Sequence, residues 1–108
     1  MKCCVFGGSG FIGSHVADHL SEISESVLIL DIHQKKNLLP NQKFKYCDIT
    51  NFKDLERIFN ENEFDYVYNF SGIADIDEAQ KNPIGTIECN ILGNSYILEL
   101  IKNKHVKK

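Results

Sequence analysis

The chain has 108 residues, 43% apolar and 25% charged, and its 12 Lys and Arg against 15 Asp and Glu give a formal net charge of −3. This size and composition predict one small folded domain and exclude a disordered chain, a collagen-like fibre and a two-domain enzyme. There is no basic stripe for nucleic acid, and no apolar run long enough for a membrane span or a signal peptide, so we expect a cytoplasmic protein.

The first 31 residues predict a strand, a helix and a second strand. Residues 3–6 form a short apolar run that ends at a glycine cluster, which is typical of a strand buried on both faces. Residues 11–24 have apolar side chains at a spacing near 3.6, which predicts a helix with one face on the sheet. Residues 27–30 repeat the buried-strand pattern and stop at Asp31, so the crossover should be right-handed.

The second half of the chain continues the alternation of strands and helices. Residues 33–42 are polar and contain Pro40, which predicts a loop rather than a helix. The remaining predicted elements are a strand at 44–47, a helix whose pattern opens at residues 49–51 with Thr50 or Asn51 as its N-cap, a strand at 66–70, and one long helix from about Pro83 into the terminal lysines. This order predicts an α/β fold with a doubly wound parallel sheet in the strand order 3-2-1-4.

A glycine motif lies directly between the first predicted strand and the first helix. Gly7 allows a tight turn, Gly10 lets the backbone approach a pyrophosphate, and Gly13 lets the helix pack closely on the sheet. The free N–H groups at the start of the helix would face the anion, helped by the helix dipole. Because strand, motif and helix agree, the pattern favours dinucleotide binding over a plain glycine-rich turn.

Asp31 ends the second predicted strand, 18 residues after Gly13. This is near the offset of about 20 residues at which an acidic residue binds the adenosine ribose hydroxyls, so we favour this role over that of an ordinary solvated residue. A carboxylate there repels a 2′-phosphate and favours NAD over NADP. Lys35 and Lys36 are close in sequence and leave NADP open as an alternative.

Four segments in the correct order resemble the NAD-dependent sugar-nucleotide epimerases and dehydratases, which are extended short-chain dehydrogenase/reductases. Residues 7–16, GGSGFIGSHV, are similar to the cofactor loop of that family. Asp48-Ile49 resembles its pair that contacts the adenine, and residues 70–72 resemble the segment near the nicotinamide ribose. Pro83 and the stretch 90–93 resemble its Asn-x-x-Gly helix, in which the Asn has a structural and cofactor-side role.

The resemblance implies that residues 1–108 are a Rossmann-like NAD-binding domain, the N-terminal part of a UDP-glucose 4-epimerase-like enzyme, truncated before strand 5. We expect NAD as the cofactor, no metal, and contact with a nucleotide sugar only through the missing C-terminal part. Strand 4 would be an exposed edge, so a homodimer or other self-association is expected. The expected cofactor-binding residues are Gly7, Gly10, Phe11, Ile12, Gly13, Asp31, Ile32, Asp48, Ile49, Phe70, Ser71, Gly72 and Asn90.

The chain has no Tyr-x-x-x-Lys pair, which the resembling family uses for general-base chemistry beside the nicotinamide. We therefore assign no catalytic residue and expect the chain alone not to be catalytic. The alternative is a stand-alone module that binds or senses NAD without chemistry. Three departures from the family pattern, Ser71, Ala79 and Asn94, leave the subfamily open. The sugar and the reaction stay open because their determinants would lie in the missing C-terminal part.

Two clusters of possible metal ligands have simpler explanations. His15 and His19 share one helix face, but a zinc site needs further ligands, so we expect solvated histidines. Asp75, Asp77 and Glu78 are not accompanied by His or Cys, and we expect them to form a solvated loop.

The four cysteines are Cys3, Cys4, Cys47 and Cys89. They have no C-x-x-C spacing, so we expect reduced thiols that serve as small apolar residues. Cys4 and Cys47 lie in predicted buried strands, where a thiol should be inert as a nucleophile.

Overall fold

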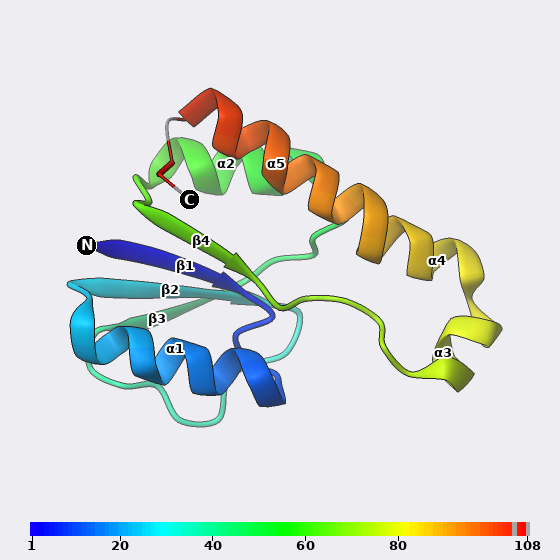
Figure 1. Cartoon of the computed structure of the whole chain (residues 1–108), viewed down its shortest axis with the longest axis horizontal. Helices are drawn as coiled ribbons and strands as arrows, with labels where there is room; N and C mark the ends of the chain where they lie inside the picture. The colour runs from blue at the N-terminus through cyan, green and yellow to red at the C-terminus, as the bar shows by residue number, and fades with distance from the viewer. Residues whose placement is uncertain (105, 108) are drawn as a thin grey trace.

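The computed structural model describes residues 1–104 and 106–107; His105 and Lys108, the last residue of the predicted domain, lie outside them. Its centre is a four-stranded parallel sheet in the order β3-β2-β1-β4, as predicted (Figure 1). The strands are β1 (Lys2–Phe6), β2 (Ser26–Asp31), β3 (Gln42–Tyr46) and β4 (Tyr66–Asn69). All three pairings are parallel, so the carboxyl ends of the strands meet at one edge of the sheet.

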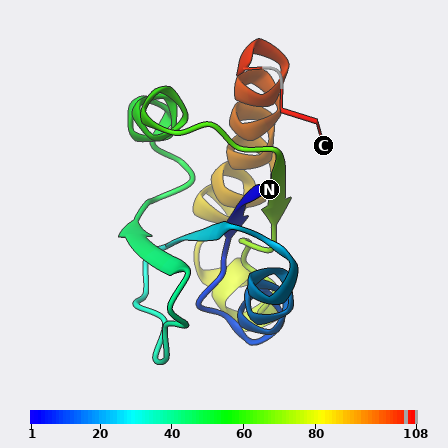
Figure 2. The same cartoon turned by 90° about the vertical axis from the view of Figure 1, so that its left-hand side faces the viewer.

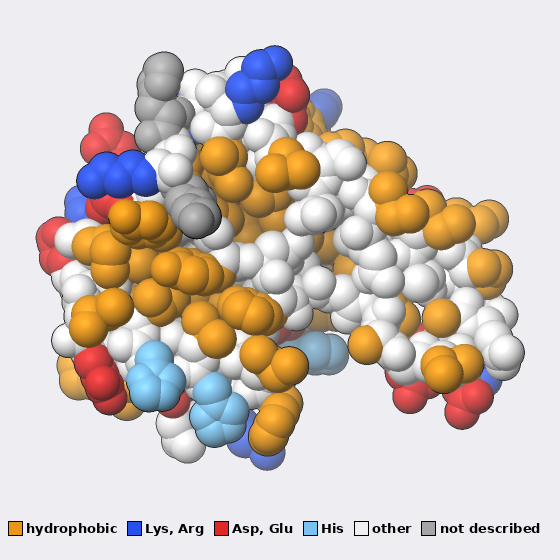
Figure 3. Space-filling view, in the orientation of Figure 1, with side chains coloured by type: hydrophobic (Ala, Val, Ile, Leu, Met, Phe, Trp, Pro, Cys, Tyr) orange, Lys and Arg blue, Asp and Glu red, His pale blue; other side chains and the backbone are white. Residues whose placement is uncertain are grey.

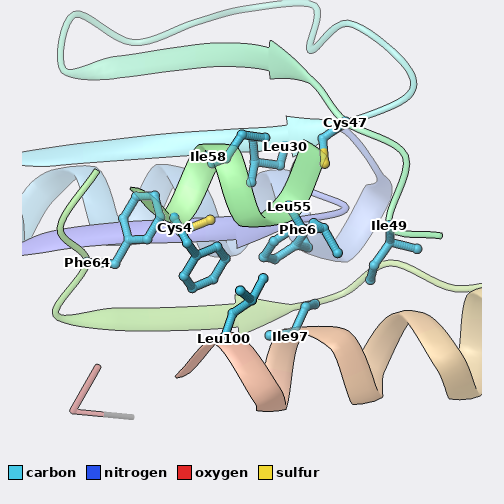
Figure 4. Packing of buried hydrophobic residues seen from close by; sticks show 11 residues of the cluster. Cys4, Phe6, Leu30, Cys47, Ile49, Leu55, Ile58, Phe64, Ile97 and Leu100 are labelled. Carbon is cyan, nitrogen blue, oxygen red and sulfur yellow. The ribbon is translucent and has the colours of Figure 1, made fainter. Parts of the chain in front are cut away.

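Alternate residues of β1 supply two hydrophobic clusters on opposite faces of the sheet. Cys3 and Val5 pack with α1 (Phe11–Ile23) on one face. Cys4 and Phe6 pack on the other face with α2 (Phe52–Glu61) and α5 (Gly93–Lys104), as Figure 4 shows. The strand is therefore buried on both faces, which explains its continuous apolar run.

The strand β3 begins two residues before its predicted start and ends one residue before its predicted end. Its pairing with β2 begins at Val27 opposite Gln42, where the Val27 N–H also donates to the Asn41 carbonyl at 3.0 Å. Cys47 lies beyond the strand, and its N–H donates to the Asp31 carbonyl. A hydrophobic pattern misses the start of β3 because Gln42 and Lys43 are polar, although Gln42 is buried and its amide donates to Asp18 and Ser21.

The segment after β4 differs most from the prediction. The expected acidic loop is wrong, because Ile76–Lys81 form the short helix α3, whose N-cap Asp75 accepts a hydrogen bond from the Glu78 N–H at 2.9 Å. A capping carboxylate satisfies an amide that the first helical turn leaves free. The acidic cluster thus starts a helix.

The predicted long last helix is confirmed from Pro83 onwards, but it is not a uniform α-helix. It begins as α4 (Pro83–Ile87), passes through a π-helical turn, η1 (Glu88–Leu92), and continues as α5. In Figure 1 the α3 and α4 segments extend well beyond the sheet. Within residues 1–104 and 106–107, no helix combines the length and the apolar character needed to cross a membrane.

Two connections tie distant parts of the chain to the sheet. The N–H of Phe70, just after β4, donates to the Phe6 carbonyl at 2.8 Å. At the other end of the strands, the N–H of Lys107 donates to the Asp65 carbonyl at 3.0 Å, so the segment after α5 returns to the start of β4. Figure 2 shows α2 and α5 beside each other and α1 separate from them.

Candidate functional site

A cleft of about 520 Å³ lies at the carboxyl ends of the strands. Its walls come from the ends of β1, β2 and β4, the segment after β3, and the α3–η1 arm, which is the place where ligands bind in open α/β sheets. Nine of the residues predicted from the sequence line it, namely Gly7, Gly10, Asp31, Ile32, Asp48, Ile49, Phe70, Ser71 and Gly72.

The other four predicted residues do not line this cleft. Phe11 and Ile12 are 84% and 62% exposed and line a shallow groove along α1. Gly13 is buried in α1 beneath the glycine turn, and Asn90 lies on η1 and contacts the loop that forms one wall. Gly13 and Asn90 therefore do not line the cleft but support the segments that form its walls.

The glycine turn needs its glycines for close backbone contacts. Gly7 has φ +72°, and its N–H donates to the Leu30 carbonyl at 2.8 Å. A Cβ on Gly7 would lie 2.5 Å from the carbonyl carbon of Phe70, and one on Gly13 would lie 2.1 Å from the Gly7 oxygen. The turn, the first turn of α1 and the end of β4 thus pack backbone against backbone.

The N-terminus of α1 opens beside this turn. Its N-cap, Gly10, has no side chain to accept a hydrogen bond, so the first amides of the helix keep donors for a ligand. A Cβ on Gly10 would lie 3.3 Å from the Gly7 oxygen, which is close but does not overlap. This arrangement can bind an anion through backbone N–H groups and the helix dipole.

Ser9 is a cleft residue that the sequence reasoning missed. Its hydroxyl is buried and is the one buried side-chain N or O atom that has no hydrogen-bond partner within the described part of the chain. A buried hydroxyl without a partner costs stability, and the position of this one in the cleft lining leaves it available to a ligand. The sequence signal was its place between the glycines of the motif.

The Asp31 carboxylate is held by two backbone amides. One oxygen accepts from the Ser9 N–H at 3.1 Å and the other from the His33 N–H at 3.1 Å. These bonds join the end of β2 to the glycine turn and to the loop that follows. They set the direction of a carboxylate that lines the cleft beside Ile32.

The end of β4 is fixed by an amide pair. The Asn69 side-chain oxygen accepts from both the N–H and the hydroxyl of Ser71, and its Nδ2 donates to the Asn94 side-chain oxygen at 3.1 Å. Asn94, one of the departures from the family pattern, therefore connects α5 to the end of β4. This places Ser71 on the cleft wall.

The side-chain amide of Asn90 holds the segment after β4 through two hydrogen bonds. Its oxygen accepts from the Ile73 N–H at 2.8 Å, and its nitrogen donates to the Ile73 carbonyl at 3.0 Å. A Cβ on Gly72, which has φ +153°, would lie 3.0 Å from the Asn90 oxygen. Asn90 belongs to the π-helical turn, and such turns are frequent at functional sites.

Replacing Asn90 by Ala is expected to free this segment while leaving the sheet intact. Loss of the two hydrogen bonds should cost about 1–2 kcal/mol of stability, because the contact between Asn90 and Ile73 is exposed to water. Faster hydrogen exchange of the Ile73 amide, with unchanged exchange in β1, would be the signature. Asn103→Ala, which removes an exposed amide from the end of α5, is the matched control. Unchanged exchange at Ile73 would contradict the role of Asn90 in holding this segment.

The lining of the cleft carries acidic groups and protonated thiols. Its carboxylates are those of Asp31, Asp48, Glu78 and Glu88, the last two not predicted as site residues. Burial raises the pKa of the Cys47 thiol to about 12 and also raises that of Cys89. Both thiols are therefore protonated near neutral pH, which for Cys47 agrees with the expectation of an inert thiol.

The alternative sites do not gain support. His15 and His19 are exposed on α1, and the described residues include no group of three His, Cys, Asp or Glu side chains arranged to hold a metal ion. All four cysteines are free, as expected. Burial is also the main cause of the raised pKa of Cys4.

Comparisons with known proteins agree with this geometry. Residues 3–108 match the NAD dependent epimerase/dehydratase family. The UDP-glucose 4-epimerase of Halalkalibacterium halodurans is 34% identical over 110 residues, which cover 100% of this chain and 33% of that protein. The chain thus spans about a third of the length of this relative.

Solved structures show the same relation. The UDP-glucose 4-epimerase of Thermotoga maritima with UDP-glucose superposes with a TM-score of 0.91 at 33% identity, covering 99% of this chain and 36% of that one. The UDP-glucose 4-epimerase of Thermus thermophilus in complex with NAD gives 0.88 at 28% identity, covering 98% and 35%. The similarity covers the whole sheet and its helices.

Proposed function

The chain belongs to the NAD dependent epimerase/dehydratase family, and we propose that it is the NAD-binding, N-terminal portion of a UDP-glucose 4-epimerase-like enzyme. The domain would comprise residues 1–108. The observation that carries the proposal is the glycine turn, where a buried Ser9 hydroxyl without a partner lies beside free amides of α1. A dinucleotide pyrophosphate has the charge and the acceptor oxygens to satisfy both.

The remaining lining fits the other parts of NAD. Asp31, oriented by two backbone amides, would accept hydrogen bonds from the adenosine ribose, and Ile32 would lie beside it. By the family resemblance, Asp48 and Ile49 would contact the adenine. Phe70–Gly72, fixed to the end of β4, would lie near the nicotinamide ribose, with Asn90 holding that wall. Phe11, Ile12 and Gly13 would contribute the first amides of α1.

Catalysis would need more polypeptide than this chain contains. Bound NAD supplies reversible hydride transfer, and the family pairs it with a Tyr-x-x-x-Lys base that this sequence does not have. We therefore propose that the chain alone binds cofactor without turnover and meets a nucleotide sugar only together with the further polypeptide that its longer relatives have. A cytoplasmic location agrees with this chemistry, and nucleic acid is not a proposed partner.

Calorimetric titration of the chain with NAD⁺ tests the proposal. We expect saturable binding that Gly10→Val weakens at least about tenfold, because the added side chain blocks the approach of the pyrophosphate. Gly85→Ala on α4 is not an inert control, because its Cβ would meet the Asn82 side chain. Glu22→Gln, an exposed change on α1, is the better control. Folded chain that binds no NAD⁺, or binding that Gly10→Val leaves unchanged, would defeat the proposal.

Self-association is expected through the face that carries α1 and the open edge of β4. Figure 3 shows hydrophobic side chains gathered on this face, and Phe11, Ile12 and Ile23 on α1 are exposed. Tyr68 on β4 is half-buried. Sedimentation velocity should show a rising mean mass with concentration, and Tyr68→Lys should reduce it, because a charge on an edge strand opposes pairing. A strictly monomeric parent chain would contradict this.

A further inference from the structure

Lys35, in the loop between β2 and β3, has a buried amino group. The residue is 6% exposed, its Nζ lies 3.0 Å from a carboxylate oxygen of Asp18 on α1, and it also donates to the Asn37 carbonyl. A buried ammonium group needs such partners, because removing it from water is costly. The position of Lys35 therefore depends on Asp18.

Asp18 is itself held in place by the start of β3. The Gln42 amide donates to Asp18 Oδ1 and to the Ser21 hydroxyl, both at 2.8 Å, and its oxygen accepts from the Leu39 N–H at 3.0 Å. The Gln42 amide, with the Lys35 ammonium, holds the pKa of the Asp18 carboxyl below its ordinary value. Asp18 is thus a charged partner near neutral pH, and the loop is fastened to α1.

The lining of the cleft, by contrast, is acidic. It contains four carboxylates and His33, and it has no Lys or Arg among the described residues. Lys35 follows Asp31 by only four positions, and the same loop begins with the lining residues Ile32 and His33. Lys35 is the buried cation closest to Asp31 in the sequence. Its ammonium group therefore binds α1 and not the end of the cleft where Asp31 lies.

We propose that Asp18 is a positioning residue for cofactor selection, which holds Lys35 away from the cleft and so favours a dinucleotide without a 2′-phosphate. This inference rests on the proposed NAD site. A 2′-phosphate adds about two negative charges at an end that Asp31 already makes acidic, and binding it requires a cation. Freeing Lys35 by removing its partner supplies one, because an unpaired buried ammonium is driven to find another anion or water.

Binding of NAD⁺ and NADP⁺ to the chain and to Asp18→Asn, measured by calorimetry, tests the inference. The expected result is that the ratio of NADP⁺ to NAD⁺ affinity rises about tenfold in Asp18→Asn, the size of one charge-assisted hydrogen bond. Adding Lys35→Met to Asp18→Asn should return the ratio to that of the parent chain. Glu22→Gln removes the same charge from an exposed position one turn further along α1 and should not change the ratio.

A second variant does not depend on how Asp18→Asn folds. Lys35→Met alone should leave the ratio unchanged, because Lys35 does not act on the cleft in the parent chain. A fall in the ratio, or an unchanged ratio in folded Asp18→Asn, overturns the inference while NAD⁺ binding stands. Failure of the parent chain to bind either dinucleotide overturns the proposed function and the inference with it.

Discussion

Gly13→Ala is expected to destabilise the fold by about 3 kcal/mol or more, near the upper limit for a single core substitution. The new Cβ would lie 2.1 Å from the Gly7 oxygen and 2.8 Å from its carbonyl carbon. Both are backbone atoms, so no side-chain rotation relieves the overlap and α1 must move away from the sheet. Urea unfolding followed by circular dichroism measures the loss directly.

Gly10→Ala is the matched control, because it adds the same methyl group three residues earlier. Its Cβ would lie 3.3 Å from the Gly7 oxygen, and Gly10 is exposed with φ −78°. The change in unfolding free energy should stay within about 1 kcal/mol. Equal destabilisation by the two substitutions would show that the close approach of α1 to the glycine turn has no special importance.

Asp31→Ala is expected to lower the affinity for NAD⁺ by about 100-fold. The substitution removes the charged acceptor at the end of β2, and hydrogen bonds to charged groups contribute about 1.5–3 kcal/mol each. It also removes the carboxylate that receives the Ser9 and His33 amides, so the glycine turn loses a support. Calorimetry with NAD⁺ gives the affinity, and circular dichroism shows whether the sheet remains.

Two further variants separate charge from position. Asp31→Asn keeps one acceptor oxygen and should lose less affinity than Asp31→Ala. Asp75→Ala removes a carboxylate that caps α3 outside the cleft lining, so it should leave NAD⁺ affinity within about twofold. An equal loss in Asp75→Ala and Asp31→Ala would indicate a general effect of net charge and would contradict a ribose contact.

The strands and their order in the sheet could be predicted because each element has a hydrophobic pattern within its own short stretch of sequence. The apolar runs in β1 and β2 and the spacing in α1 and α2 follow directly from burial. The strand β3 was harder, because Gln42 and Lys43 begin it and pairing with β2 outweighs their polarity. The helix α3 was missed because Asp75 and the neighbouring acidic residues are typical of both solvated loops and helix starts.

Residues of the cleft could be predicted from the sequence where a residue type at a given position has one characteristic structural role. The glycine turn and Asp31 carry such signals, and nine predicted residues line the cleft. Glu78 and Glu88 could not be assigned, because their part in the lining depends on how the α3–η1 arm is placed in space. The π-helical turn that presents Asn90 likewise has no pattern in the sequence.

The contact between Gly7 and the end of β4 also determines when the cleft can form during folding. A Cβ on Gly7 would overlap the backbone of Phe70 and Ser71, two residues far along the chain, so the turn takes its shape against a distant segment. Contacts between such distant residues form slowly, because the intervening chain must first be ordered. The hydrogen bonds of the glycine turn lie within the first strand–helix–strand unit, but the cleft wall made by Phe70–Gly72 is added only when β4 docks onto β1. We therefore expect the complete cleft to form together with the four-stranded sheet.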